Sequence, residues 1–234
     1  MPNKPQTLSI IIPVLNEAPH IGNLLTYLSK NSSPHLISEI ICVDGGSTDN
    51  TSAIAKKHGA RVILSERGRA VQMNLGAKHA QGSVLYFLHA DTFPPKHFDQ
   101  IILKATEKGH KAGCFRMKFD TKNRFLGFFA WFSRINHILC RGGDQSLFVQ
   151  QALFNQLGGF NETYKIYEDT EFISRVYRHD QFMVLPHYVV TSARKYHEVG
   201  WFRLQFHFAM IHLKNFFGAG PEELHRYYNK NILT

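Results

Sequence analysis

Short runs of β-branched and other apolar residues alternate with helix-like segments over residues 8–92 of this 234-residue chain. The runs, each typical of a buried strand, are Leu8–Val14, Glu39–Asp44, Arg61–Leu64 and Val84–Thr92. The segments between them carry apolar side chains at helical spacing: Glu17–Ser29, Asp49–His58 and Gly68–Ala80. Four strands joined by three helices predict an α/β fold with a parallel sheet and right-handed crossovers.

Carboxylates follow three of these runs, at the ends that parallel strands share on one edge of a sheet. They are Glu17, Asp44 and Asp91. Because open α/β sheets bind their ligands at this edge, the three acids predict a binding site there. Two glycines follow Asp44 and would let a ligand come close to the backbone. Acids in such positions also cap helices and turns, and that alternative stays open here.

The net charge of +9 indicates an anionic partner, which is a nucleic acid, a membrane surface or a phosphorylated substrate. No GxGxxG pattern follows the first strand and no Walker sequence occurs, so hydride transfer and P-loop chemistry are disfavoured. The three cysteines are far apart, which argues against a disulfide framework or zinc cluster and favours a cytoplasmic location. Neither a signal peptide nor an apolar run of about 18 residues is present, so we expect a soluble or peripheral protein.

Beyond Pro94 the alternation changes. The pattern predicts helices over Phe98–Lys108 and Arg124–Leu139 and strands over Ala112–Phe119 and Ser146–Val149. Glu168 and Asp169 then open a helix that runs to about Arg178, where the helix dipole alone could explain two acids. The aromatic segment Trp201–Phe217 has apolar residues on more than one face, so it either completes the core or lies in a membrane interface. With the similarly aromatic segment at 124–139, we favour peripheral membrane contact.

Six motifs along the chain together resemble glycosyltransferase family 2. They are IIPVLNE at 11–17, VDGGSTDNT at 43–51, ERGRAVQMNLGAKHAQG at 66–82, HADT at 89–92, GGDQSLF at 142–148 and YEDTEF at 167–172. The resemblance implies an inverting enzyme of GT-A fold that uses a nucleotide-diphospho-sugar. The Gly-Arg-Ala-x-Gln-Met-Asn pattern and TSARKY at 191–196 are similar to a small bacterial subgroup labelled arsenosugar biosynthesis glycosyltransferase.

The resemblance also implies roles for single residues. It assigns the nucleotide and the diphosphate to a set of strand-end and helix residues: Pro13, Leu15, Glu17, Asp44, Arg67, Arg69, Gln72 and Asn74. It implies that Gly143, Asp144 and Gln145 face the acceptor. It makes Asp169 the general base and Glu168 a residue that orients its neighbours, since inversion needs one carboxylate opposite the leaving group.

The metal motif of the family, Asp-x-Asp, is altered in this chain because His89 replaces the first aspartate. Asp91 matches the second, which the resemblance implies binds the donor and a divalent cation bridging its diphosphate. Oxygen ligands favour Mg²⁺ or Mn²⁺, and a nearby imidazole favours Mn²⁺. His89 and His197 are the further candidate metal ligands.

These residues together predict a GT-A-type domain over residues 1–200, with a mostly parallel sheet flanked by helices, and a C-terminal helical extension over residues 201–234. The expected reaction is transfer of a sugar to an acceptor hydroxyl with inversion. One alternative is a polyprenyl-phosphate sugar synthase, although long membrane segments are missing. A nucleotidyltransferase would need a glycine-rich basic loop after the first strand, which residues 13–19 lack. A noncatalytic nucleotide- or nucleic-acid-binding module would explain the charge but not the acids, so we expect no nucleic-acid partner.

Overall fold

The computed structural model describes residues 6–233. Its strands are Leu8–Val14 (β1), Ile37–Asp44 (β2), Arg61–Leu64 (β3), Val84–Phe87 (β4), Thr92–Phe93 (β5), Ala112–Phe119 (β6), Leu147–Gln150 (β7) and Phe182–Thr191 (β8). Its α-helices are Ala18–Asn31 (α1), Thr51–Lys57 (α2), Arg69–His79 (α3), Phe98–Glu107 (α4), Arg124–Trp131 (α5), Gln151–Gln156 (α6), Glu168–His179 (α7), Arg194–Val199 (α8), Trp201–Phe216 (α9) and Pro221–Ile232 (α10). Short 3₁₀ turns occupy 34–36, 132–134, 138–140 and 143–145.

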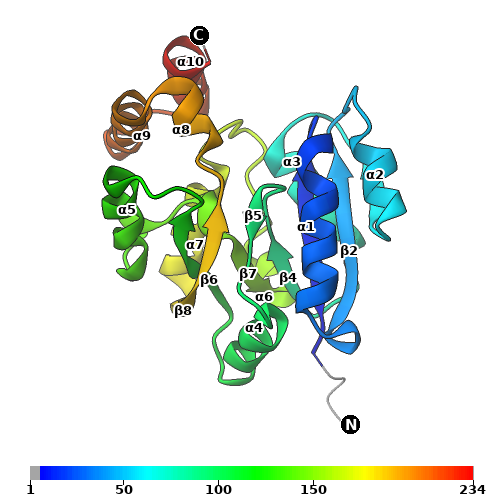
Figure 1. Cartoon of the computed structure of the whole chain (residues 1–234). Helices are drawn as coiled ribbons and strands as arrows, with labels where there is room; N and C mark the ends of the chain where they lie inside the picture. Colours follow the sequence, from blue (N-terminus) through cyan, green and yellow to red (C-terminus); the bar gives the residue numbers. More distant parts are fainter. Residues whose placement is uncertain (1–5, 234) are drawn as a thin grey trace.

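One sheet runs through the molecule in the order β3-β2-β1-β4-β7-β6-β8-β5 (Figure 1). The strands β3, β2, β1 and β4 are parallel neighbours, which confirms the prediction made from the alternation of strands and helices. Beyond β4 the sheet is mixed, because β7 is antiparallel to both β4 and β6, and β5 is antiparallel to β8, whereas β6 and β8 are parallel. Of these seven pairings four are parallel and three antiparallel.

The sheet is buried on both faces, as the continuous apolar runs predict. On β1, Leu8, Ile10 and Ile12 pack into one cluster with the buried face of α1, and Ile11 packs into a second cluster with α3 and α7. Each fully buried side chain of this size contributes about 1.5–3 kcal/mol. Helices therefore hold both faces of the sheet and leave its strand ends as the open edge.

A third cluster joins the C-terminal helices to the sheet. Leu204 and Ile211 of α9 and Leu224 of α10 pack with Tyr196 of α8 and with Leu126 of α5. These helices lie together at the end of the molecule away from the N-terminus (Figure 1). Within residues 6–233, no helix combines the length and apolar character that a membrane span needs. The division into residues 1–200 and 201–234 stays a prediction.

The predicted helix over residues 124–139 is wrong beyond Trp131, where α5 ends. The hydroxyl of Ser133 donates to the carbonyl of Ala130 (2.6 Å) and accepts a hydrogen bond from the backbone N–H of Met117 on β6 (3.1 Å). Serine thereby ties the chain to the sheet in place of another helical turn. The run that begins at Val84 also leaves the sheet early, since β4 ends at Phe87.

Candidate active site

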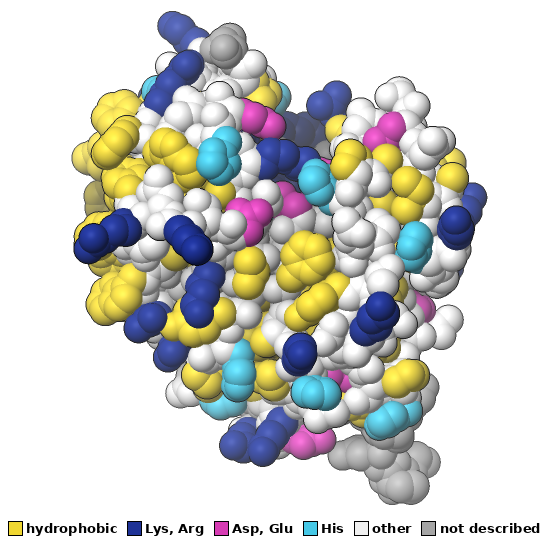
Figure 2. All heavy atoms as spheres, in the orientation of Figure 1, with side chains coloured by type: hydrophobic (Ala, Val, Ile, Leu, Met, Phe, Trp, Pro, Cys, Tyr) yellow, Lys and Arg dark blue, Asp and Glu magenta, His cyan; other side chains and the backbone are white. Residues whose placement is uncertain are grey.

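The loops that follow β1, β2 and β4 meet at one edge of the sheet. Val14 and Asp44 pair at the ends of β1 and β2, and the backbone N–H of Glu17 donates to the hydroxyl of Thr51 across the two loops (2.8 Å). Asp91 follows β4, the strand that pairs with β1 on the side away from β2. The three strand-end acids therefore share the edge at which the sequence predicts a site. In Figure 2 this edge is hollowed between the C-terminal helices and the side that carries α1–α3.

Arg194, the first residue of α8, reaches this edge from the C-terminal part of the chain. Its guanidinium lies 3.2 Å from Oε1 of Glu17 and 3.7 Å from Oδ2 of Asp91. The guanidinium thus balances two site acids with a positive charge. Arg194 belongs to the TSARKY motif, but the sequence alone does not indicate its place in the site, because the apolar pattern does not predict β8, the strand that precedes it.

The carboxylate of Asp44 is buried and organises the turn after β2. It accepts hydrogen bonds from the backbone N–H groups of Gly46 (3.1 Å) and Ser47 (2.7 Å) and from the hydroxyl of Ser52. Burial alone would raise the pKa of Asp44, but the hydrogen bonds from Ser52, Ser47 and Gly46 lower it overall. Asp44 is therefore ionised and fixed in place, and its contact with the nucleotide base stays a prediction.

The other two residues predicted for the base pocket lie at the end of β1. Pro13 is buried within the strand, where it pairs with Val43, and Leu15 is half-buried just beyond it. Only Leu15 therefore reaches the loop that borders the edge. Asn16 follows in the left-handed region at φ 55°, which turns the chain away from the sheet towards α1.

Two amide side chains predicted to contact the donor are used inside the protein instead. Gln72 on α3 is buried, and its Nε2 donates to the carbonyls of Val14 (2.9 Å) and Val43 (2.7 Å). Asn74 donates to the carbonyl of Phe160 and accepts from its backbone N–H, both at 2.9 Å. Gln72 thus joins the ends of β1 and β2 and Asn74 holds the loop after α6, so neither enters the donor contacts that we propose.

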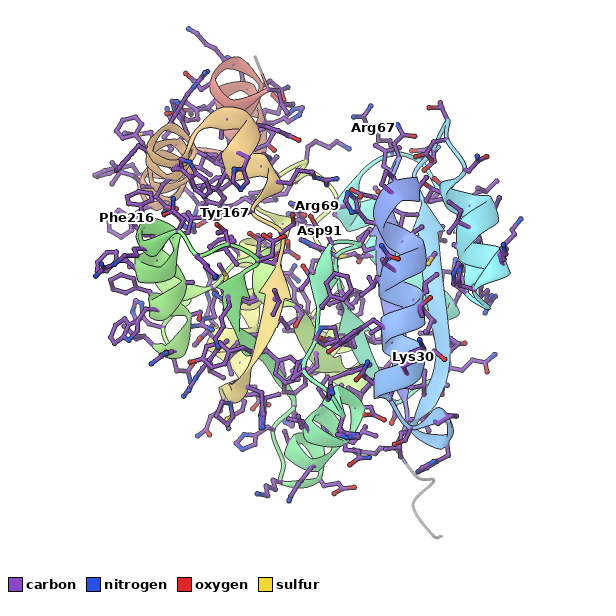
Figure 3. All side chains as sticks on the ribbon, viewed as in Figure 1. Lys30, Arg67, Arg69, Asp91, Tyr167 and Phe216 are labelled. Atoms are coloured by element: carbon purple, nitrogen blue, oxygen red, sulfur yellow. The ribbon has the colours of Figure 1, made fainter. Side chains whose placement is uncertain are left out.

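The two arginines predicted for the diphosphate differ in their surroundings (Figure 3). Arg67 is exposed in the loop before α3. Arg69, the first residue of α3, is also exposed, at 45% of its side chain, but its Nε lies 2.6 Å from Oε1 of the fully buried Glu168. The negative charge of Glu168, and to a smaller extent that of Asp169, raises the pKa of Arg69, so its guanidinium stays charged. Arg69 is therefore the cation that lies beside both acids at the start of α7.

Asp169 differs from Glu168 in its access to the edge of the sheet. It is almost fully buried, yet no described group donates a hydrogen bond to its carboxylate. Burial raises the pKa of Asp169, with Arg69 opposing the rise and Asp144 adding to it. Burial likewise raises the pKa of Glu168 against the pull of Arg69. Neither oxygen of Glu168 has a hydrogen-bond partner in the described part of the chain either, so both acids have the free lone pairs and raised pKa of a general base. Glu168 differs in being fully buried and in forming an ion pair with Arg69.

Gly143 lies against the carboxylate of Asp169, with the ring of His89 beside it. A Cβ added at Gly143 would lie 2.2 Å from Oδ2 of Asp169 and 3.1 Å from Cε1 of His89, so only glycine fits between them. Burial and the nearby Arg69 lower the pKa of His89, which keeps its ring neutral, and its Nδ1 lies 3.7 Å from Oδ1 of Asp144. Gly143 and Asp144 therefore border the same group of side chains.

Gln145, the third residue predicted for the acceptor, lies below the site. It is buried, its Oε1 accepts from Arg141 (2.7 Å), and its Nε2 donates to the carbonyl of Cys140 (2.6 Å). The buried guanidinium of Arg141 also donates to the thiol of Cys114 (3.0 Å). Gln145 and Arg141 thus brace the loop that presents Gly143, and this buried position accounts for the glutamine without an acceptor contact.

The predicted set of metal ligands comes together only in part. His197 is exposed and its ring packs on Trp201, with the centroids 4.4 Å apart. Across residues 6–233, no three His, Cys, Asp or Glu side chains are grouped so that they could hold an ion by themselves. Asp91 does suit a cation, since its carboxylate is partly exposed and already faces the guanidinium of Arg194. A divalent ion at Asp91 would therefore need oxygens from the ligand as well.

The sequence of the chain matches a model of known proteins described as "Glycosyl transferase family 2" over residues 9–155. The chain belongs to glycosyltransferase family 2. The match covers the strand ends at Glu17, Asp44 and Asp91 and the loop at Gly143. It stops before Asp169, which therefore rests on the geometry described above.

Two curated relatives of this glycosyltransferase differ in how much of the chain they match. A glycosyltransferase named AglE, from Haloferax volcanii, is 31% identical over 94 residues, which is 37% of this chain and 31% of the relative. A PGL/p-HBAD biosynthesis glycosyltransferase from Mycobacterium bovis is 28% identical over 203 residues, 82% of this chain and 77% of the relative. These relatives do not show the narrower resemblance to the arsenosugar subgroup.

A solved structure shows the GT-A fold of this glycosyltransferase. It is a mannosyltransferase, PcManGT from Pyrobaculum calidifontis, in complex with GDP-Man and Mn²⁺. The two folds superpose with a TM-score of 0.70 at 20% identity, over 97% of this chain and 70% of the other. The predicted fold class is thereby confirmed, including the helical C-terminal region.

Proposed function

We propose that this glycosyltransferase moves a sugar from a nucleotide-diphospho-sugar to an acceptor hydroxyl with inversion, and that Asp169 is the general base. The observation that carries the proposal is the carboxylate of Asp169, which lies against Gly143 at the edge of the sheet, is almost fully buried and receives no hydrogen bond from any described residue. The carboxylate of Glu168 also lacks a hydrogen bond from any described residue, but it is fully buried and its Oε1 forms an ion pair with Nε of Arg69 at 2.6 Å. The two acids therefore have different tasks.

In the proposed reaction Asp169 takes the proton of the acceptor hydroxyl while the hydroxyl oxygen attacks the anomeric carbon. The bond from that carbon to the diphosphate oxygen breaks, and its electron pair leaves with the nucleoside diphosphate. A single displacement of this kind inverts the anomeric centre, and it needs one carboxylate base rather than two carboxylates. The raised pKa of Asp169 strengthens it as a base, because its affinity for the proton is higher than that of an exposed aspartate.

Cations at the edge of the sheet suit the diphosphate of the donor. Arg69 is held by Glu168, Arg194 lies between Glu17 and Asp91, and Arg67 is exposed at the rim. A guanidinium group can donate two hydrogen bonds to the oxygens of one phosphate, so these arginines would orient the donor and bind the leaving group. Glu168 is then a positioning residue, since it acts on the donor only through Arg69.

Asp91 is the residue that would hold Mg²⁺ or Mn²⁺, with diphosphate oxygens completing the ligand set. The partial exposure of its carboxylate, just beyond the end of β4, supports this assignment, as does the Mn²⁺ in the complex of the Pyrobaculum mannosyltransferase. When bound, the ion would offset the negative charge that grows on the leaving nucleoside diphosphate. His89 borders the site as a neutral imidazole and is the second candidate ligand.

A hydroxyl acceptor agrees with Asp169 better than a phosphate acceptor does. The phosphate of a polyprenyl carrier is already ionised at neutral pH and would need no base, and a second anion beside Asp169 and Asp144 would be repelled. The free lone pairs of Asp169 therefore favour an alcohol over the polyprenyl-phosphate alternative.

A thermal-shift screen of nucleotide sugars, with and without Mn²⁺, tests the proposed donor class. A ligand at about 100 times its Kd stabilises the folded state by about 2.7 kcal/mol, which raises Tm by about 5–10 °C for a chain of this size. We expect at least one nucleotide sugar to do so, and to do so more strongly with Mn²⁺. If neither nucleotide sugars nor nucleoside diphosphates shift Tm, with or without Mn²⁺, the proposed donor class is wrong.

The contact between Gly143 and Asp169 gives a second prediction. We expect Gly143→Ala to lower turnover by about 10- to 100-fold, because the new Cβ, 2.2 Å from Oδ2, would force the base out of place. Gly142→Ala is the matched control, since a Cβ at Gly142 meets nothing within 4 Å. The measurement is initial transfer rate for both variants. Wild-type turnover in Gly143→Ala would show that the position of this carboxylate does not matter.

A further inference from the structure

The exposed hydrophobic side chains of the protein are concentrated in two segments. Of the twelve large hydrophobic residues that are exposed within residues 6–233, nine lie at 128–139 or 202–217. The most exposed of them are Phe202 at 73% and Phe216 and Phe217 at 78% each. Monomeric soluble proteins rarely leave a continuous apolar surface of this kind uncovered, so it indicates an interaction site.

The exposed residues of α9 form one stripe along the helix. Phe202, Phe206, Leu213 and Phe216 recur at intervals of four, seven and three residues, which places them on a single face. Leu204 and Ile211 are buried in the cluster shared with α10, so the core already takes the other face. Packing within the chain therefore explains half of the apolar surface of α9 and leaves the stripe free.

Ring contacts join this stripe to α5. Phe125 lies 4.3 Å from Phe202 between ring centroids, and Phe125 also contacts Phe129 at 4.9 Å. Phe128 continues the series to Phe132 at 5.2 Å. We call the exposed surface of α5 and α9 the aromatic face. In Figure 2 hydrophobic side chains gather along this edge of the molecule with Lys and Arg side chains among them, and Figure 3 shows Phe216 pointing outward.

The charge of the aromatic face has one sign. Residues 121–139 and 201–217 contain no Asp or Glu, but they contain five basic residues: Lys122, Arg124, Arg134, Arg203 and Lys214. Lys214 is paired with Glu223 of α10 at 2.8 Å. No described acid forms an ion pair with any of the other four, which leaves a positive charge around the exposed rings.

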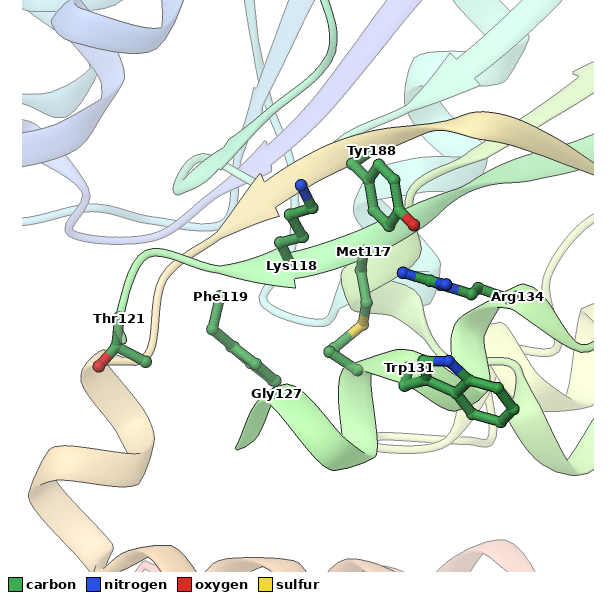
Figure 4. Close-up of a pocket in the computed structure, with 9 residues that line it drawn as sticks. Met117, Lys118, Phe119, Thr121, Gly127, Trp131, Arg134 and Tyr188 are labelled. Atoms are coloured by element: carbon green, nitrogen blue, oxygen red, sulfur yellow. The ribbon is translucent and has the colours of Figure 1, made fainter. Parts of the chain in front are cut away.

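A pocket of about 280 Å³ opens at the border of the aromatic face, between α5 and the strands β6 and β8. Lys118 and Arg134 lie on either side of the ring of Tyr188 (Figure 4), with Nζ of Lys118 4.3 Å and Cζ of Arg134 5.7 Å from the ring centroid. Met117 and Trp131 form apolar walls, and no acid lines the pocket. A pocket that combines two cations with apolar side chains suits an anion that is attached to an apolar group.

We propose that the aromatic face docks on an anionic lipid bilayer and that the pocket takes a lipid phosphate. Aromatic rings flanked by unpaired basic residues are what an interfacial helix presents to such a surface. A second copy of the chain fits less well. A twofold dimer would place the same basic segments against each other, with no acids there to compensate. The face is separate from Asp91 and Asp169, so docking does not depend on the donor.

Co-sedimentation with vesicles tests the proposal. We expect the protein to bind vesicles of phosphatidylcholine mixed with phosphatidylglycerol and to bind pure phosphatidylcholine weakly. Binding should fall from about 0.01 M to about 1 M salt, because the Debye length shrinks from about 30 Å to about 3 Å. Sedimentation with neither vesicle at low salt would overturn the proposal.

Surface variants separate the lipid surface from other occupants. F206S/F216S removes two exposed rings, so vesicle binding should fall at least about tenfold while the circular dichroism spectrum is unchanged. K118Q/R134Q should weaken binding to anionic vesicles only. Leu64→Ser is the matched control, since Leu64 is 74% exposed on β3, the outermost strand at the other side of the sheet from β6 and β8. This variant should bind vesicles as the wild type does. Unaltered vesicle binding in F206S/F216S, or a dimer that this variant dissociates, would show that another surface or a second copy is involved.

Discussion

The variant Asp169→Asn is expected to lose turnover by about 10²–10⁴-fold, while its donor binding and Tm stay close to those of the wild type. Asparagine keeps the shape of the side chain but lacks the basic carboxylate oxygen that takes the acceptor proton. The loss should appear in kcat rather than in KM for the donor, because the arginines and Asp91 that surround the diphosphate are untouched. Initial rates over a range of donor concentrations measure both constants.

Glu171→Gln is the matched control for this variant. Glu171 lies in the same first turn of α7, so it shares any favourable interaction with the helix dipole, but its carboxylate is paired with Arg175 at 2.7–2.8 Å. Turnover of Glu171→Gln should remain near wild type. If Asp169 only stabilised the start of the helix, both variants would lose about 1 kcal/mol of stability or less and both would turn over normally. Retention of most of the transfer rate by Asp169→Asn would remove it from the mechanism.

The variant Asp91→Ala is expected to lose metal-dependent affinity for the nucleoside diphosphate by about 100-fold or more. Its carboxylate is the described side chain best placed to join a cation to the diphosphate, because it is partly exposed and faces Arg194 at 3.7 Å. The fold should survive, since an exposed pair at that distance contributes at most about 1 kcal/mol. Affinity without metal should change little, as it depends on the arginines.

Asp180→Ala provides the control for loss of a carboxylate. Asp180 is a partly exposed acid that pairs with Lys111 at 2.8 Å, but it lies at the C-terminal end of α7, away from Asp169 at the start of that helix. Its removal should leave metal-dependent binding as in the wild type. Equal loss in Asp91→Ala and Asp180→Ala would point to a general effect of charge rather than to a metal ligand.

The sequence predicted the parallel half of the fold because its signals are local. The strands at residues 8–14 and 61–64 have the predicted bounds. The first is buried along its whole length, and in the second, which lies at the side of the sheet, the β-branched pair at 62–63 favours a strand. The order of strands beyond β4 depends on which distant segments pair, and β8 gave no clear apolar alternation with which to find it. Six of its ten residues, those at 183–184, 186–188 and 190, are half-buried or exposed and do not alternate with the buried ones.

In the candidate site, too, the residues with local signals can be placed from the sequence and the others cannot. Glu17, Asp44 and Asp91 could be placed on one edge from the sequence, because parallel strands end together. The amides of Gln72, Asn74 and Gln145 could not be assigned, since a motif shows that an amide is present but not whether it faces a ligand or a backbone carbonyl. In the structure the amide nitrogens of all three donate to backbone carbonyls.

Two further residues show how a motif can mislead: one was assigned to the site and lies outside it, and the other was not assigned and lies in it. His197 was a candidate metal ligand on residue type alone, but one helical turn after Arg194 its ring packs on Trp201 instead. Arg194 was passed over, although its guanidinium lies within 4 Å of two site acids. Only the position of α8 against the sheet edge distinguishes them.

We propose that the edge of the sheet binds a nucleotide-diphospho-sugar through a metal ion at Asp91. Isothermal titration calorimetry of UDP and of GDP, with Mn²⁺ and with EDTA, into the wild type and Asp91→Ala tests it most directly. We expect one nucleotide site in the wild type, with affinity that rises with Mn²⁺, and the loss of that rise in Asp91→Ala. Binding of the nucleotide that is equally tight in both proteins with Mn²⁺, or no binding of either nucleotide by the wild type, would contradict it.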